Sequence, residues 1–282
     1  MLLARLREKY HPFFWLRRSA LGSALLAALD FPLPWRFRGI AFPVWVRSVR
    51  HASLVLLGPD AERPLYDCIQ AAAAIGETRR IWDVGANIGW YSWVLLSRSP
   101  EAKAVLLEPD PVNLALLART ARRLGARAEI VAAAAGDRTG HRPFAIDRMT
   151  GATGSLVVED TFLGRHYGRK TGLLEVRSIR LDELLGRFEP PDLLKIDVEG
   201  AERLVVAGAG AVLAHQPVVV YETSAANRDA LSAHFGALGY ALFDAEGYGR
   251  AEQLSPNVLA WPKRLAERTD ALLAAWRGRT RL

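Results

Sequence analysis

The chain has 282 residues, half of them apolar, and a single cysteine, Cys68. It is long enough for one large globular domain with appendages. One cysteine excludes an intramolecular disulfide and a metal site built from several cysteines, which fits a reducing compartment and a cytoplasmic protein. Because Cys68 lies in an alanine-rich helical pattern, we interpret it as a small buried side chain rather than a nucleophile.

The net charge of +7 is unevenly distributed. Residues 1–50 carry nine basic and two acidic groups, residues 261–282 carry six and two, and the residues between them carry 22 and 26. The mildly acidic body argues against a nucleic-acid substrate, since an enzyme of that class has basic surface around its site. The basic ends predict contact with a membrane surface, an acidic glycan or a partner. Alternatively, 32 arginines and five lysines reflect only the composition of a GC-rich bacterial genome.

Residues 1–50 form a basic N-terminal extension whose pattern differs from that of the rest of the chain. The apolar run from Ala20 to Leu29 is shorter than the roughly 20 residues that cross a bilayer, and no convincing cleavage site of a secretory signal follows it. Two interpretations remain open. The segment is either a helical cap packed on the domain or an interfacial helix, which would place the protein at the inner face of the membrane.

Regular alternation of strands and helices begins at Arg80. The elements expected before it are short strands and one helix, at residues 40–42, 44–49, 54–57 and 64–75. The elements expected after it are strands at 81–84, 103–108 and 128–133 and helices at 89–98 and 111–124. This order is typical of a doubly wound, Rossmann-like parallel α/β sheet, which binds its ligand at the carboxyl ends of its strands.

The loop after the first of these strands contains four candidate cofactor-binding residues, Asp83, Gly85, Asn87 and Gly89. Glycines allow a close approach of the backbone to a ligand, and the N–H groups that begin the next helix favour a carboxylate or a phosphate. A dinucleotide fingerprint would need glycines at positions 87 and 90, where asparagine and tryptophan stand. Pyrophosphate binding is therefore disfavoured.

Glu108 ends the second strand, about twenty residues after the loop, where a carboxylate suits hydrogen bonding to ribose hydroxyls. The predicted ligand is a nucleoside that carries a carboxylate, of which S-adenosyl-L-methionine is the common example. Asp137 is a further candidate near the adenine side, although its sequence context is also that of a plain turn.

Residues 141–180 interrupt the alternation with short predicted strands and glycine-bearing loops. We expect this small β-rich insertion to hold the acceptor substrate, because loops beside a site vary while the scaffold stays fixed. His166 and Tyr167 lie in it. His166 is either a base or a solvated loop histidine.

A second chemical centre follows the buried strand at residues 193–196. Asp197 and Glu199 stand at its end, and Glu222 follows the strand at 218–221. Carboxylates at neighbouring strand ends can act as a general base and as an orienting group. The alternative is capping of a helix expected at 199–213, since acidic residues favour a helix N-terminus. For Glu202 we expect a structural role.

Three blocks of the sequence resemble the FkbM-type family of S-adenosylmethionine-dependent methyltransferases. They are DVGANIGWY at 83–91, Glu108-Pro109 with Asn113 behind it, and LKIDVEGAE at 194–202. The similarity continues through Gly208, Ala209 and Pro217 to Glu222 and covers residues 75–262.

The resemblance implies a class I methyltransferase that methylates a hydroxyl of a sugar, polyketide or other secondary metabolite. A helix expected at 226–238 is followed by two strands, at 240–243 and 257–261, with a polar loop between them. The resemblance also implies that these two strands form an antiparallel edge hairpin. We therefore divide the chain into the extension at 1–50, a methyltransferase domain at 51–262, and a basic helix at 263–282 that packs on the domain or on a partner.

We therefore predict cofactor contacts for six residues: Asp83, Gly85, Asn87, Gly89, Glu108 and Asp137. We predict catalytic roles for Asp197, Glu199 and Glu222. The sequence shows no metal cluster, although folding can bring carboxylates together around a divalent ion. Competing hypotheses are a nucleic-acid methyltransferase, a non-catalytic nucleoside-binding scaffold, and a peripheral membrane protein that acts on a lipid-linked glycan.

Overall fold

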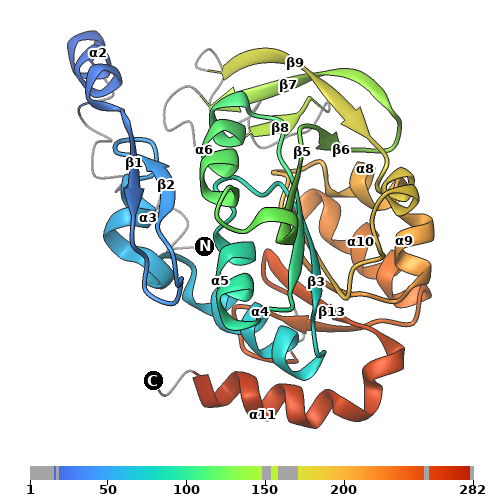
Figure 1. Ribbon diagram of the computed structural model, residues 1–282. Coiled ribbons are helices and arrows are strands. Elements are labelled where there is room, and N and C mark those ends of the chain that lie inside the picture. Colours follow the sequence, from blue (N-terminus) through green and yellow to red (C-terminus); the bar gives the residue numbers. More distant parts are fainter. Residues whose placement is uncertain (1–15, 17–18, 148–153, 158–170, 251–253, 280–282) are drawn as a thin grey trace.

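The computed structural model describes residue 16 and residues 19–147, 154–157, 171–250 and 254–279. In this part of the chain a central sheet is covered by helices on both faces, and a smaller sheet lies at one end of it (Figure 1). The candidate substrate contacts His166 and Tyr167 lie outside the described residues, as does most of the two loops expected around them.

The central sheet has seven strands among the described residues, in the order β12-β13-β11-β10-β3-β4-β5. Its parallel strands are β3 (Arg80–Val84), β4 (Lys103–Leu107), β5 (Ala128–Val131), β10 (Leu193–Ile196) and β11 (Val218–Glu222). The antiparallel pair at the edge is β12 (Ala241–Asp244) and β13 (Asn257–Trp261), as expected. The chain order changes direction between β3 and β10, which makes their carboxyl ends the switch point where this fold binds ligands.

Successive side chains of the central strands point into two cores, because side chains alternate across a strand. Leu193 of β10 belongs to one core and Leu194 to the other. The first core is covered by α4 (Arg63–Ile75), α5 (Trp90–Arg98), α6 (Pro111–Ala121) and α11 (Thr269–Arg279). The second is covered by α8 (Glu202–Ala207), α9 (Gly210–Ala214) and α10 (Ala225–Ala237). Short 3₁₀ turns connect several elements: η3 (Gly125–Arg127), η5 (Leu181–Gly186) and η6 (Lys263–Arg268).

The basic C-terminal helix packs on the domain. Leu272 and Trp276 of α11 are fully buried in the first core. The predicted insertion is also present as a second sheet of order β6-β9-β7-β8. Its strands are β6 (Ala134–Ala135), β7 (Gly140–Asp147), β8 (Gly154–Leu156) and β9 (Thr171–Ile179).

Four local expectations are wrong. Residues 40–42 form no strand; instead β1 (Pro32–Trp35) pairs with β2 (Val44–Arg47), because Gly39 takes a left-handed conformation in the connecting turn. Residues 54–57 belong to helix α3 (Ala52–Leu57), since leucine suits a helix as well as a strand and Gly58 ends it at positive φ.

The expected helix at 199–213 starts later and is broken. Glu199 and Gly200 both have positive φ, so the helix begins at Glu202, and it is interrupted between Ala207 and Gly210. A Cβ on Gly208 would lie 2.0 Å from the Gly136 carbonyl oxygen, so this close approach requires a glycine at the break. The strand expected at 128–133 likewise divides into β5 and β6, which belong to different sheets.

The N-terminal extension consists of α2 (Ala20–Leu29), β1 and β2, and continues through α3 and the 3₁₀ turn η2 (Gly58–Glu62). Asp30 fixes its fold. The Asp30 carboxylate accepts hydrogen bonds from Arg47 Nε at 2.6 Å and from the backbone N–H groups of Val49 and Arg50 at 3.0 and 3.1 Å. The extension is thereby joined to the segment that leads into the domain.

Arg50 and His51 connect this segment to the sheet top. Arg50 Nη2 lies 2.9 Å from Asp110 Oδ2, and both side chains are nearly buried, at 10% and 6% exposure. His51 Nδ1 accepts a hydrogen bond from the Arg47 N–H at 2.9 Å, and its ring interacts with Asn87. Burial, together with the charge of Arg50, lowers the pKa of His51 to about 3.

We predict that His51 makes stability depend on pH. An unfolded histidine titrates near pH 6.5, so between about pH 6.5 and 3 the unfolded chain binds one more proton than the native protein. The free energy of unfolding therefore falls as the pH is lowered through this range. Urea unfolding at several pH values should show a weaker dependence for His51→Asn than for the wild type.

The variant His141→Asn is the matched control, because that side chain is exposed on β7. It should keep the wild-type pH dependence. An equal dependence in His51→Asn and the wild type would show that His51 is not the titrating group.

Candidate functional site

A cavity opens at the carboxyl ends of β3, β4 and β10. Its polar lining comprises Asn87, Glu108, Asp110, Asn113, Asp197 and Glu199, and its apolar lining includes Leu107, Ala133–Ala135, Phe144 and Leu156. Five of the predicted site residues therefore meet here: Gly85, Asn87, Glu108, Asp197 and Glu199. The insertion supplies part of the wall, since Phe144, Gly154 and Leu156 belong to its strands.

The Glu108 carboxyl is held rigidly at the cavity. Oε1 accepts a hydrogen bond from the Asp110 N–H and Oε2 accepts one from the Asn87 N–H, both at 2.8 Å. A carboxylate oxygen can accept two hydrogen bonds, so each retains the capacity for a hydroxyl donor. Burial raises the pKa of Glu108 to about 7, even though the two N–H groups favour its charged form. This arrangement fits the predicted binding of two ribose hydroxyls.

The glycines of the loop are required by protein packing. A Cβ on Gly85 would lie 1.8 Å from the Asp197 carbonyl oxygen, and a Cβ on Gly89 would lie 2.5 Å from the Trp93 ring. Both glycines have positive φ, as does Asn87, a residue type that tolerates this conformation. The sequence pattern located the loop, but the physical reason for Gly85 and Gly89 is the approach of β10 and of the Trp93 side chain.

Asp83 does not line the cavity. Its carboxylate is fully buried, accepts a hydrogen bond from Ser92 Oγ at 2.8 Å, and lies 3.1 Å from Lys195 Nζ. A buried carboxylate that is paired with Ser92 and Lys195 interacts with groups of the protein itself. Direct contact of Asp83 with a cofactor remains a prediction, and the structure shows a supporting role behind the loop.

Lys195 is the residue that the sequence analysis missed. Its buried ammonium group lies between Asp83 and Asp197, 3.4 Å from the Asp197 carboxylate, and donates a hydrogen bond to the Gly85 carbonyl at 3.0 Å. Burial lowers its pKa, but the two carboxylates outweigh this and raise the pKa above its usual range. The available signal was a charged residue inside the apolar strand sequence Leu-Leu-Lys-Ile of β10.

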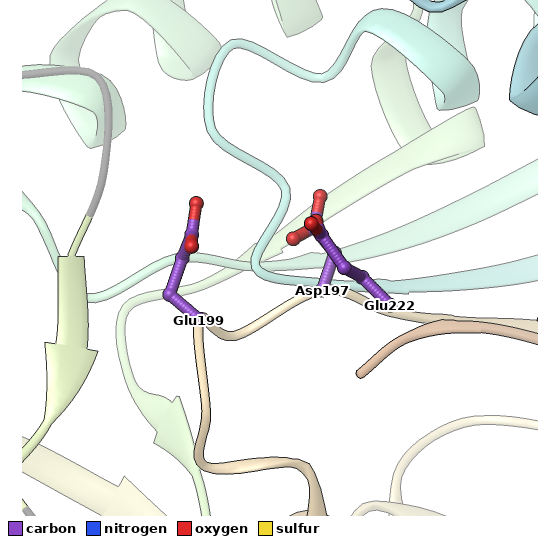
Figure 2. Close-up of side chains that lie close together, drawn as sticks. All are labelled: Asp197, Glu199 and Glu222. Atoms are coloured by element: carbon purple, nitrogen blue, oxygen red, sulfur yellow. The ribbon is translucent and has the colours of Figure 1, made fainter. Parts of the chain in front are cut away.

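Asp197 and Glu199 of the cavity lining come together with Glu222. Figure 2 shows the three side chains. One carboxylate oxygen from each lies within 4.8 Å of the others, so folding creates a carboxylate cluster that the sequence alone did not show. Three carboxylates at this spacing can hold a divalent cation. Burial and the charges of Asp197 and Glu199 raise the pKa of Glu222 well above its usual value.

The remaining predicted residues lie outside the cavity lining. Asp137 is 2.6 Å from Arg142 Nη1, and its contact with a cofactor stays a prediction. Glu202 is buried and accepts hydrogen bonds from the Gly200 N–H at 2.7 Å and from Asn227 Nδ2 at 3.2 Å. Its role is structural, as the sequence indicated.

Comparison with known proteins identifies one family. The profile of the methyltransferase FkbM domain matches residues 83–248, which is more than half of the chain and includes most of the cavity residues. Among curated proteins the sequence has no match.

Solved structures of methyltransferases are similar to this chain at low sequence identity. A methyltransferase from Geobacter sulfurreducens is 14% identical, with 86% of this chain and 96% of that one covered and a TM-score of 0.41. Precorrin-6y C5,15-methyltransferase from Geobacter metallireducens is 15% identical, with 68% and 87% covered and a TM-score of 0.40. Similarities of this size do not assign a substrate.

We predict that Lys195→Met destabilises the protein by about 3–5 kcal/mol, because it leaves the Asp83 carboxylate buried without its positive partner. Adding Asp83→Asn should recover part of this loss, since the buried charge is then removed as well. Guanidinium unfolding of the single and double variants measures both effects.

Lys103→Met is the matched control, because Lys103 is exposed at the start of β4 in the same sheet. It should change the free energy of unfolding by no more than about 0.5 kcal/mol. A loss below about 1 kcal/mol in Lys195→Met would contradict the proposed importance of the buried ion pair.

Proposed function

Since the chain belongs to the methyltransferase FkbM domain family, we propose that it transfers the methyl group of S-adenosylmethionine to a hydroxyl oxygen of a sugar, glycan or secondary metabolite. The observation that carries this proposal is the presence of the buried Glu108 carboxyl and the Asp197 carboxylate in one cavity. Glu108 can accept hydrogen bonds from the ribose of a nucleoside, and Asp197 can accept the proton of an acceptor hydroxyl.

The cavity residues fit the cofactor by their chemistry. Glu108 offers one acceptor position on each oxygen to the ribose hydroxyls, while Leu107, Phe144 and Leu156 offer apolar contact to a base. When bound, the sulfonium supplies a methyl group that is already activated for transfer. The protein therefore needs to position the acceptor oxygen and remove its proton.

Asp197 is the proposed base or orienting group. Its side chain is 27% exposed, and Lys195, which also pairs with Asp83, lies 3.4 Å away, so the carboxylate is accessible and has a cationic neighbour. Glu222 stands beside it, with one carboxylate oxygen within 4.8 Å of an oxygen of Asp197. Glu199 lines the same cavity and is the second candidate for orienting the acceptor.

A contact of the second sheet supports its assignment to acceptor binding. Ser155 Oγ of β8 donates a hydrogen bond to the Val198 carbonyl at 2.9 Å, which joins the insertion to the segment between Asp197 and Glu199. We propose that this insertion and the carboxylates enclose a small acceptor together.

We expect Asp197→Asn to lower kcat by about 10²–10³, because the amide keeps the shape of the side chain but accepts no proton. Affinity for S-adenosylmethionine should change less than about threefold. Transfer of a labelled methyl group to a panel of sugars and phenolic or polyketide alcohols measures the rate, and calorimetry measures the affinity.

Asp229→Asn, an exposed substitution of the same kind on α10, should retain the wild-type rate. An unchanged kcat in Asp197→Asn would contradict the assigned role. Labelling of an amine or of RNA, with no labelled alcohol, would contradict transfer to a hydroxyl.

A further inference from the structure

Exposed apolar side chains are concentrated in the N-terminal extension and the segment that follows it. Among the described residues, eight of the twelve large apolar side chains that are exposed lie between Leu16 and Leu57. Five of them form what we call the N-terminal apolar surface: Leu21, Leu25 and Leu29 of α2, and Phe31 and Trp35 of the strand segment after it. A soluble domain rarely exposes such a group without a partner for it.

The three leucines lie on one face of α2, because residues four apart are neighbours on a helix. They are 83%, 51% and 50% exposed, whereas Leu26 is buried. Helix α2 is attached to the rest of the extension by hydrogen bonds. Its C-cap residue Asp30 accepts them from Arg47 and from the N–H groups of Val49 and Arg50. Figure 1 shows α2 beyond the end of the β1 and β2 hairpin, away from the central sheet.

Positive charge borders this surface. Arg36 and Arg38 are exposed just after β1, and in the sequence Arg17 and Arg18 directly precede the helix. Residues 1–50 carry nine basic and two acidic groups in all. Apolar and aromatic side chains flanked by arginines are the composition with which a protein binds the interface of an anionic bilayer.

Helix α2 is too short to cross a bilayer. Ten residues of helix extend about 15 Å, half the thickness of the hydrocarbon core. No helix in the described ranges is both long and apolar enough to span a bilayer. A second copy of the chain is a poorer occupant, because it would bring the same net positive charge against this segment.

We propose that the N-terminal apolar surface docks the protein on an anionic lipid membrane, with the leucine face of α2, Phe31 and Trp35 inserted among the headgroups and with Arg36 and Arg38 contacting lipid phosphates. This inference is independent of the reaction that the cavity catalyses. The basic helix α11 lies at the other end of the molecule in Figure 1 and packs on the domain, so α2 is the docking element.

Cosedimentation of the full-length protein with vesicles tests the proposal. The vesicles contain phosphatidylcholine alone or with about 30% phosphatidylglycerol. The wild type should bind the anionic vesicles at least about tenfold more strongly than the neutral ones, and added salt should weaken binding. The double variant Leu21→Asp/Leu25→Asp should lose at least about tenfold in affinity for the anionic vesicles.

Leu173→Asp is the matched control, because Leu173 is 67% exposed on β9. It should bind vesicles as the wild type does, and all variants should keep the wild-type melting temperature. Failure of the wild type to bind anionic vesicles, or equal binding by the double variant, would overturn the proposal. A wild-type dimer that the double variant converts to a monomer, without vesicle binding, would identify a second copy as the occupant instead.

Discussion

The arrangement of the site depends on one buried cation. Lys195 lies between Asp83 and Asp197 and donates a hydrogen bond to the Gly85 carbonyl, so it joins β3, the glycine loop and the end of β10. Charges of this kind are stable away from water only when they are paired and hydrogen-bonded. The position of each partner is therefore constrained by the other two, at the switch point of the sheet.

The two sides of the glycine loop have different chemical surroundings. On one side, Glu108 is fixed by the N–H groups of Asn87 and Asp110 and faces the part of the cavity that suits a nucleoside. On the other, Asp197 stands with Glu199 and Glu222 at the ends of β10 and β11. Gly85 packs directly on the Asp197 carbonyl, so the loop and the end of β10 are in close contact.

The extension takes part in this arrangement. Arg50 forms an ion pair with Asp110 of the cavity lining, and His51 interacts with Asn87 of the loop. Tyr91 donates a hydrogen bond to Glu62 of η2, and the Glu62 charge acts on both Lys195 and Glu222. Residues ahead of the family match thus contribute to the electrostatics of the site.

The sequence was sufficient for features that follow from local pattern. Strand ends with acidic residues placed Glu108 and Asp197 at the same edge of a parallel sheet, and the alternating order predicted the sheet itself. It was insufficient where partners come from distant segments. The pairing of Lys195 with Asp83, across 112 positions, and the cluster that adds Glu222 to Asp197 exist only after folding. The strand expected at 54–57 was wrong, because a short apolar run satisfies helix and strand patterns equally.

Binding of S-adenosylmethionine is the most direct test of the account. Calorimetric titration of the wild type should give a micromolar dissociation constant, and Glu108→Ala should weaken it at least about tenfold, since two hydrogen-bond acceptors for ribose are lost. Glu108→Gln, which keeps the size of the side chain, should lose less, and both variants should melt cooperatively. Absence of binding to the wild type with acceptor alcohols present, or equal affinity in Glu108→Ala, would contradict the assignment of the cavity to this cofactor.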